Sequence, residues 1–447
     1  MILFNKKVLV YGLKESGLGA IKLLKKHKAK VFCYDDNKEN FSNLPNFCDD
    51  IVKVEAITEN LLSFIDLIVV SPSISLTNKN LILAQILGKK IISEIELAYL
   101  FKKGKIISVT GSNGKSTTVS LIYHILSRAG KKTSLVGNIG NSFAKEVSLS
   151  KRKTYVVEVS SFQLEASQKY RSNIACFLNF CENHLDRHFS LVEYFNAKKK
   201  LFDNQKSSDF AVLNFDEEKI KNIKTKAKKF YFSLKNKVKG AFLDGDKIYF
   251  NNGVCEEVLS LSSIKLKGEH NIQNVLCAVV ACKLYGISNE QIKGGVETFF
   301  GLSHRIEFVD NIDGISFYND SKSTTTKSTL TALNCFENNN VLLILGGSDK
   351  NCDFSNLFPI NSCVKKIFAI GNTKDKIMLC AKQNGFLNVE AFDNFKFMVE
   401  ASLNFAKAEN LNVVLLSPAT ASFDMFKNFE ERGDVFKNCV KELKSEK

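Results

Sequence analysis

The sequence predicts an α/β protein whose sheets are mostly parallel. Short apolar runs alternate with helical patterns along the chain, and glycine-containing turns follow several of these runs. A chain of 447 residues corresponds to about three domains. Because parallel strands must be joined by a crossover, usually a helix, the expected alternation of strands with helices favours parallel pairing.

The first region begins with an apolar strand, Lys7–Tyr11, which runs into Gly12 and Gly17. A helical pattern and a second strand follow, and this strand ends at Asp35. Glycines at such a turn let the backbone approach a phosphate or a nucleotide. The full G-x-G-x-x-G pattern is absent because Lys14 stands at the second glycine position, so a tight turn without a ligand remains an alternative. Further elements are expected at 65–70, 81–87 and 90–92.

The composition is that of an ordinary globular protein, with 45% hydrophobic and 24% charged residues. It excludes a disordered, collagen-like or coiled-coil chain. No run of about 18 uncharged apolar residues occurs, and the N-terminal residues lack a signal-peptide pattern. We therefore expect a cytoplasmic protein without membrane insertion. The twelve cysteines include no Cys-x-x-Cys pair, so we interpret them as buried thiols rather than disulfides or a zinc site.

The net charge of +15 raises the question of a nucleic-acid partner. The basic residues are nearly all lysines, they are scattered, and basic runs such as 221–229 contain no interleaved aromatic residues. We therefore expect a solvated, lysine-rich surface and no nucleic-acid binding. The positive potential would still attract anionic substrates such as nucleotides.

Two further α/β regions follow the first. The second is expected from Lys105 to about Phe300, after a helical link at 94–97, and the third begins near Gly301. The strands predicted for the third region are 315–319, 341–345, 366–370 and 413–416.

A glycine-rich loop carries the clearest chemical signal. It follows an apolar strand and opens a helix, which is the context of a phosphate-binding loop. The helix N-terminus adds positive potential, Lys115 can reach the β- and γ-phosphates, and the Ser116 hydroxyl can bind Mg²⁺. Val109 stands where the general pattern has glycine, so the loop is a shortened variant. Its residues are Gly111, Ser112, Asn113, Gly114, Lys115, Ser116 and Thr117.

Two other segments carry candidate metal ligands. Glu158 follows a predicted strand, where a carboxylate could bind Mg²⁺, although capping the next helix is an equal alternative. The segment 179–188 contains two of the six histidines of the chain, together with Asp186 and Arg187. This concentration predicts that His184 binds a metal or a phosphate. The spacing does not fit a zinc protease.

Together these residues resemble the Mur ligase family, the ATP-dependent amide-forming enzymes of peptidoglycan precursor synthesis. The loop G-T-N-G-K-S/T of the family is similar to residues 111–116, and the resemblance runs from residue 8 to about residue 436. Within the family, four segments resemble the members that add D-glutamate to UDP-N-acetylmuramoyl-L-alanine. They are Ser160–Glu165, Gly301–Glu307, Asn319–Thr324 and Ser417–Gly433.

The resemblance implies three domains. They are a Rossmann-like domain for the UDP substrate at 1–95, a P-loop-type ATP-binding domain at 96–300, and a Rossmann-like domain for D-glutamate at 301–447. It also implies that ATP phosphorylates the substrate carboxylate and that the amine of D-glutamate attacks the resulting acyl phosphate. ATP and Mg²⁺ are the implied cofactors, and we expect a monomer.

The resemblance also implies roles for matching residues. Catalytic roles fall to Lys115, Asn138, His184 and Lys198, and Mg²⁺ would be held by Ser116, Glu158, His184 and Lys198. Besides the loop, ATP would be contacted by Asn271, Asn274, Arg305 and Asp320. The UDP substrate would be contacted by Leu13, Ser16, Asp35, Ser71 and Asn138. D-glutamate would be contacted by Lys322, Thr324, Lys350, Ser422 and Phe429.

Lys198 has a special role by this resemblance. The pattern Tyr194-x-x-Ala197-Lys198 is similar to a family segment whose lysine reacts with carbon dioxide and becomes a carbamate. An anionic carbamate suits Mg²⁺, whereas an ammonium group would repel it. Because Lys199 and Lys200 follow directly, an ordinary basic helix is the alternative.

The sequence departs from the family pattern at a few positions. Asn183 replaces the aspartate that usually precedes the metal-binding histidine, Ser73 and Ser75 replace Gly and Pro, and Thr420 replaces a common cysteine. No arginine follows Asp35, which leaves the uracil contacts open. None of these changes removes a residue essential to the chemistry.

Two other functions remain as alternatives. A folate polyglutamate synthase shares the fold and the loop, but it would lack the segment 160–164 and the UDP-type first domain, and it adds L-glutamate. A non-catalytic nucleotide-binding module would require decayed metal ligands, whereas Lys115, Glu158 and His184 are all present.

Overall fold

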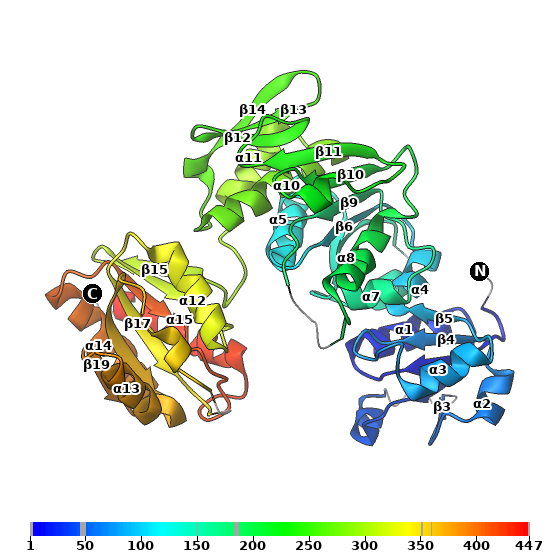
Figure 1. The fold of residues 1–447 in the computed structure, drawn as a ribbon, viewed down its shortest axis with the longest axis horizontal. Coiled ribbons are helices and arrows are strands. Elements are labelled where there is room, and N and C mark those ends of the chain that lie inside the picture. The colour runs from blue at the N-terminus through cyan, green and yellow to red at the C-terminus, as the bar shows by residue number, and fades with distance from the viewer. Residues whose placement is uncertain are drawn as a thin grey trace. The chain divides into compact units, whose positions relative to one another are not determined.

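The computed structural model describes residues 3–44, 51–149, 151–182, 187–349, 352–358 and 360–445. These residues form three β-sheets with helices beside them (Figure 1). The chain divides into two compact units. The first contains residues 1–264 with 269–299 and holds two of the sheets, and the second contains residues 265–268 with 300–447 and holds the third. The predicted α/β class is confirmed.

The first sheet is parallel throughout, with the strand order β3-β2-β1-β4-β5. Val8 and Val10 of β1 pack in one apolar core with α1, whereas Leu9 and Tyr11 pack in another with α2 and α3. Helices therefore cover both faces, as expected of a Rossmann-like sheet. The strands are β1 (Lys7–Tyr11), β2 (Lys30–Tyr34), β3 (Val52–Lys53), β4 (Leu67–Val70) and β5 (Ile91–Ser93). The helices are α1 (Glu15–Lys26), α2 (Glu59–Phe64), α3 (Lys79–Ile86) and α4 (Glu94–Phe101).

The second sheet has nine strands in the order β14-β13-β12-β11-β10-β9-β6-β8-β7. Pairing is parallel from β7 across to β12 and antiparallel from β12 to β14. The strands are β6 (Ile106–Thr110), β7 (Thr133–Gly137), β8 (Thr154–Glu158), β9 (Ile174–Phe177), β10 (Phe210–Asn214), β11 (Lys228–Ser233), β12 (Gly240–Asp244), β13 (Lys247–Asn251) and β14 (Cys255–Ser260). The helices are α5 (Lys115–Arg128), α6 (Phe143–Ser148), α7 (Ser161–Glu165), α8 (Leu191–Lys199), α9 (Glu218–Lys221), α10 (Glu269–Tyr285) and α11 (Asn289–Glu297).

The expectation that strands alternate with helices throughout is wrong for residues 228–260. Here β11 to β14 follow one another without a helix, and the last three form two hairpins. Gly245 and Gly253 lie in the turns with φ angles of +62° and +98°, which glycine adopts without strain. The dipeptides Asp244-Gly245 and Asn252-Gly253 favour such turns, so the sequence did carry the signal.

The third sheet has the order β15-β16-β20-β17-β18-β19 and is parallel except for the β15–β16 hairpin. Leu342 and Ile344 of β17 pack with α14 and α15, whereas Leu343 and Leu345 pack with α12 and α13. The four predicted strands are confirmed. The strands are β15 (Glu307–Ile312), β16 (Ile315–Asn319), β17 (Val341–Gly346), β18 (Val364–Ile370), β19 (Val389–Phe392) and β20 (Val413–Leu416). The helices are α12 (Thr326–Leu333), α13 (Lys374–Gln383), α14 (Phe395–Ala408) and α15 (Phe429–Ser445).

The cysteines only partly fit their prediction. Among the described residues none forms a disulfide. Cys181 and Cys255 are exposed, so the expectation that the thiols are buried is wrong for these two.

Candidate active site

The phosphate-binding loop lies between β6 and α5. Gly111 and Gly114 have φ angles of +153° and +79°, a region that other residues rarely adopt. Gly114 is the N-cap of α5, and no side chain of the described residues caps this helix, so its first N–H groups can face an anion. Lys115 Nζ donates to the carbonyl oxygens of Gly111 and Ser112, both at 2.8 Å. The loop thus combines a helix N-terminus with an ammonium group, two features that bind phosphate.

The residues that follow β9 hold this loop in place. The Asn113 N–H donates to Asn179 Oδ1 at 2.8 Å, and Asn179 Nδ2 donates back to the Asn113 carbonyl at 3.2 Å. Ser112 Oγ donates to the carbonyl of Cys181 at 3.0 Å. Because β6 and β9 are parallel neighbours, the loops at their carboxyl ends meet at one edge of the sheet.

Helix α10 also contacts the loop, through Asn274. Thr118 Oγ1 donates to Asn274 Oδ1 at 3.2 Å, and a Cβ added to Gly114 would lie 2.3 Å from the same oxygen. Asn274 Nδ2 donates to Asn271 Oδ1 at 3.0 Å. These contacts explain why residue 114 must be glycine. A contact of Asn271 and Asn274 with adenine stays a prediction.

Glu158 is the last residue of β8 and is buried, with 2% of its surface exposed. Its Oε1 accepts a hydrogen bond from Asn138 Nδ2 at 2.8 Å, whereas its Oε2 is buried and has no hydrogen-bond partner among the described residues. The helix-capping alternative for Glu158 is wrong, because Ser160 and Gln163 form the capping box of α7. A buried carboxylate oxygen without a partner is uncommon and fits a ligand of a hard cation such as Mg²⁺.

The rest of the predicted metal site is only partly visible. His184 and its neighbour Asn183 lie outside the described residues. Ser116, in the first turn of α5, is half-buried. Within the described ranges no group of three or more His, Cys, Asp or Glu side chains comes together, so Mg²⁺ binding rests here on Glu158.

Lys198 lies on α8 and is buried, with 1% of its surface exposed. Its Nζ donates to the carbonyl of Gly111 at 2.9 Å and lies 4.5 Å from the centre of the Tyr194 ring. Burial, and then the charge of Lys115, lower the pKa of Lys198 to about 7. A substantial fraction of this amine is therefore neutral at physiological pH, unlike that of an ordinary lysine.

The candidate UDP-binding residues of the first sheet meet where the strand order reverses, between β1 and β4. This is where doubly wound sheets bind their ligands. Ser71 Oγ donates to the Gly12 carbonyl at 3.1 Å, and Asp35 Oδ2 accepts from the Leu13 N–H at 2.6 Å. Leu13 is buried, and Ser16 is half-buried in the first turn of α1. Both Asp35 and Ser71 therefore have structural roles in the glycine turn, and their contacts with a ligand stay predictions.

In the second unit, Arg432 organises the predicted D-glutamate segments. This side chain is 1% exposed and donates to five oxygen atoms. Two of them are Ser321 Oγ and the Ser321 carbonyl, both at 2.9 Å, and the others are carbonyls of Gly346, Thr420 and Ala421. The motif Ser417–Gly433 contains Arg432, but sequence reasoning assigned it no role. The sequence does not show that this arginine is buried, and its burial is what indicates a structural role.

The other candidate residues of this unit have varied surroundings. Asp320 is buried, accepts from Ser417 Oγ at 2.7 Å, and burial raises its pKa to about 6. Ser422 Oγ is buried without a hydrogen-bond partner in the described part of the chain, which fits a ligand contact. Lys322 Nζ lies 5.7 Å from the centre of the Phe429 ring. Thr324 is half-buried and Arg305 is exposed, whereas Lys350 lies outside the described residues.

A basic hollow of about 770 Å³ lies apart from the phosphate loop. It is lined mainly by basic residues, among them Lys103, Lys105, Lys131 and Lys132. These residues precede β6 and β7, whereas the loop follows β6, so the hollow and the loop lie at opposite edges of the parallel sheet. The hollow is therefore not part of the nucleotide site.

Comparison with known proteins agrees with the motifs. The model of the Mur ligase MurD-like N-terminal domain matches residues 6–93, and that of the Mur ligase middle domain matches residues 109–282. A protein of Caldicellulosiruptor bescii is 39% identical over 459 residues, covering 99% of each chain. One of Acidobacterium capsulatum is 41% identical over 452 residues, covering 98% of this chain and 97% of its own. Both are named UDP-N-acetylmuramoylalanine–D-glutamate ligase. The chain belongs to the Mur ligase family.

Solved structures share the fold at low identity. The UDP-N-acetylmuramate–alanine ligase MurC of Thermotoga maritima has a TM-score of 0.56 and 18% identity, with 99% of this chain and 100% of that chain covered. The MurF ligase of the same organism, in complex with ADP, has a TM-score of 0.55 and 12% identity, with 98% and 96% covered. None of the helices in the described ranges is both long and apolar enough to cross a bilayer.

Proposed function

We propose that this protein joins the L-alanine carboxylate of UDP-N-acetylmuramoyl-L-alanine to the amine of D-glutamate, with ATP as the second substrate. The observation that carries the proposal is the similarity, at 37–41% identity over nearly the full chain, to proteins named for that ligation. The phosphate loop, the buried Glu158 and the buried Lys198 support it, because they supply an anion site, a carboxylate and a reactive amine.

The reaction has two steps. A carboxylate oxygen of the substrate attacks the γ-phosphorus of ATP, the bond from that phosphorus to the ADP oxygen breaks, and an acyl phosphate forms. The amine nitrogen of D-glutamate then attacks the acyl carbon. The tetrahedral intermediate expels phosphate, and the nitrogen loses a proton. The task of the protein is to position the reactants and to offset negative charge.

The phosphate loop would bind ATP through its N–H groups and Lys115. The ammonium group of Lys115 already lies over the carbonyls of Gly111 and Ser112, and phosphate oxygens would replace these carbonyls as its partners. Further ATP contacts are proposed for Asn271, Asn274, Arg305 and Asp320.

Bound Mg²⁺ would offset the charge of the phosphate oxygens. We assign its protein ligands to Ser116, Glu158, His184 and a modified Lys198. Asn138 fixes Glu158 Oε1, so Oε2 is the oxygen available to the metal. Asn138 itself is exposed and would contact the muramoyl substrate near the reacting carboxylate.

The modification of Lys198 is part of the proposal. Its neutral amine would attack the carbon of carbon dioxide, the new N–C bond would form, and the nitrogen would release a proton to leave a carbamate. The lowered pKa of about 7 supports this step, because only the neutral amine is a nucleophile.

We propose that the three sheets divide the substrates. Residues 1–95 would bind the UDP substrate through Leu13, Ser16, Asp35 and Ser71, and residues 96–300 would bind ATP. Residues 301–447 would bind D-glutamate through Lys322, Thr324, Lys350, Ser422 and Phe429. We also expect the enzyme to be monomeric and cytoplasmic.

Phosphate release tests this function. The protein is incubated with ATP, Mg²⁺, UDP-N-acetylmuramoyl-L-alanine and one amino acid from a panel of D-glutamate, L-glutamate, L-lysine and diaminopimelate. We expect D-glutamate to support release well above the others, and omission of the UDP substrate to abolish it. Equal rates with L-glutamate would favour the folate-type alternative.

A further inference from the structure

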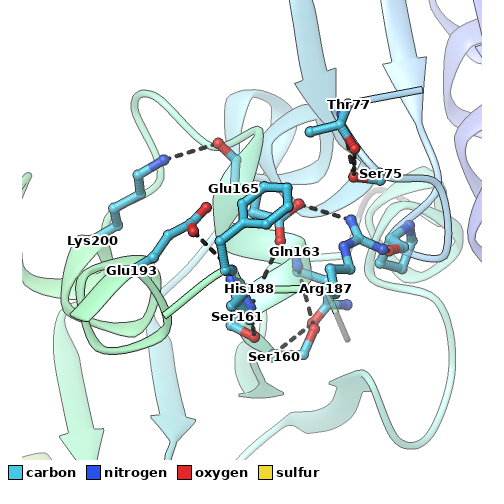
Figure 2. Close-up of polar contacts among 12 residues, drawn as sticks. Ser75, Thr77, Ser160, Ser161, Gln163, Glu165, Arg187, His188, Glu193 and Lys200 are labelled. Atoms are coloured by element: carbon cyan, nitrogen blue, oxygen red, sulfur yellow. Dashed lines mark hydrogen bonds and ion pairs between the residues drawn. The ribbon is translucent and has the colours of Figure 1, made fainter. Parts of the chain in front are cut away.

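Arg187 connects two parts of the first unit that are far apart in the sequence. Its Nη1 donates to the Pro72 carbonyl at 2.7 Å, and its Nη2 donates to the Ile74 carbonyl at 3.0 Å. Both carbonyls belong to the loop 71–77, which follows β4. The same Nη2 lies 2.7 Å from Glu165 Oε2 at the end of α7. Figure 2 shows Arg187 between Glu165 and the loop that carries Ser75.

Helix α7 is built to hold this arginine. The Arg187 guanidinium lies 4.3 Å from the centre of the Phe162 ring. The His188 ring stacks on the same ring, with 5.5 Å between the two ring centres. His188 Nε2 and Ser161 Oγ are 2.9 Å apart, and Lys200 Nζ donates to the Glu165 carbonyl at 3.0 Å (Figure 2). The segment Ser160–Glu165, which sequence analysis singled out as a signature, thus anchors Arg187.

Both ends of this connection lead to the candidate site. The loop 71–77 begins with Ser71, whose hydroxyl binds the Gly12 carbonyl at the reversal of the first sheet. Helix α7 begins three residues after Glu158, the candidate metal ligand at the end of β8. Arg187 therefore joins the loop beside the proposed UDP site to the helix that follows the proposed metal site.

The contacts need an arginine in particular. The side chain is 12% exposed, and its planar fork reaches two carbonyls and a carboxylate at once. A lysine has a single nitrogen and cannot reproduce this geometry. Arg187 Nε is buried without a hydrogen-bond partner in the described part of the chain, an uncommon arrangement that calls for an explanation.

We propose that Arg187 is a positioning residue, which sets the substrate loop 71–77 relative to Glu158. The inference rests on the proposed function and deepens it. Without the guanidinium, the loop 71–77 would no longer be held, so the UDP substrate would bind to it less tightly. ATP binding itself should be preserved, because Arg187 makes no described contact with the phosphate loop.

The experiment compares Arg187→Ala, Arg187→Lys and Glu165→Gln in the full chain. For Arg187→Ala we expect the KM for the UDP substrate to rise at least about tenfold, with the KM for ATP changed less than about twofold. The KM of Arg187→Lys for the UDP substrate should lie between those of Arg187→Ala and the wild type. The double variant Arg187→Ala with Glu165→Gln should have the same KM for the UDP substrate as Arg187→Ala, since the two residues act together.

Arg171→Ala is the matched control. Arg171 also forms a half-buried ion pair in the first unit, with its Nε 2.6 Å from Asp209 Oδ2 and its Nη2 2.8 Å from Asp209 Oδ1, but none of its described hydrogen bonds reaches the loop 71–77. We expect this variant to lower the melting temperature without a selective change in either KM.

An unchanged KM for the UDP substrate in folded Arg187→Ala would overturn the inference, as would an equal rise of both KM values or the same selective rise in Arg171→Ala. If Arg187→Ala does not fold, the KM of Arg187→Lys for the UDP substrate decides. Hydrogen exchange of the loop 71–77 gives a second readout. It should be faster in the Arg187 variants than in the wild type even if the wild type shows no ligase activity, a result that would contradict only the proposed function.

Discussion

Two buried cations, one in each unit, are held in different ways. Lys198 donates one hydrogen bond, to the Gly111 carbonyl, and lies against the Tyr194 ring. Arg432 donates five hydrogen bonds to carbonyl and hydroxyl oxygens of the segments around it. Both side chains are 1% exposed, and among the described residues neither forms an ion pair with a carboxylate.

The comparison shows that burial can make one cation reactive and leave another cation charged. Burial lowers the pKa of Lys198 to about 7 and that of Arg432 to about 10. Lys198 can therefore lose its proton near neutral pH and react, whereas Arg432 stays charged and keeps its loops in place. The following predictions test this contrast, beginning with the residue whose charge contributes to the low pKa of Lys198.

Lys115→Ala should have the largest effect. It removes the cation over the phosphate loop and should lower the rate of phosphate release by about 10²–10³. It also removes a positive charge near Lys198, so the pKa of Lys198 should rise. The fold should survive, because Lys115 is only half-buried at the start of α5, and circular dichroism checks this. Near-native activity would contradict the assignment of the loop.

Lys198→Ala should lower the rate by about 10- to 100-fold, because it removes a proposed metal ligand. Acetate, a small carboxylate that can occupy the vacated space, should restore part of the activity. Phosphate release with and without acetate measures both effects, and Lys199→Ala on the same helix is the control. Full activity in Lys198→Ala, or an unmodified lysine beside bound Mg²⁺ in a crystal structure, would contradict the carbamate.

Arg432→Lys should mainly destabilise the second unit. A lysine keeps a positive charge but cannot bind five oxygen atoms, so we expect a loss of about 1.5–3 kcal/mol in the free energy of unfolding. The KM for D-glutamate should rise with it, about tenfold. Denaturant unfolding and steady-state kinetics measure these changes, with the exposed Arg128→Lys as control. If Arg432→Lys kept the wild-type free energy of unfolding and the wild-type KM for D-glutamate, Arg432 would not organise the site.

The last prediction concerns the dependence of stability on pH, where the change is gradual and not confined to one substitution. Because the pKa of Lys198 is lowered from 10.5 to about 7 on folding, the unfolded chain binds more protons between these two values. The free energy of unfolding should therefore rise with pH from about 7 to 10, by at most about 1.4 kcal/mol per pH unit, relative to Lys198→Met.

This comparison is made by denaturant unfolding in buffer without carbon dioxide and Mg²⁺, and Lys199→Met should keep the wild-type slope. Arg432 should add no slope until the pH approaches about 10. A pH-independent difference between wild type and Lys198→Met would mean that the amine is not neutral in the folded protein.

Local patterns were enough to predict the phosphate loop and most parallel strands. An apolar run followed by glycines and a helical pattern specifies the β6–loop–α5 unit from adjacent residues, and strands 315–319 and 413–416 have their predicted bounds. The hairpins of residues 240–260 could also have been predicted from the sequence, because Asp244-Gly245 and Asn252-Gly253 are local turn signals.

Only the tertiary structure decided how the distant residues of the site meet. Asn274 packs on Gly114, Arg187 binds the carbonyls of the loop after β4, and Arg432 binds Ser321 in a segment more than a hundred residues away. The sequence names these side chains, but their hydrogen bonds depend on which strand ends become neighbours in a sheet. The low pKa of Lys198 has the same origin, because it comes from burial and from the nearby charge of Lys115, which only the folded chain provides.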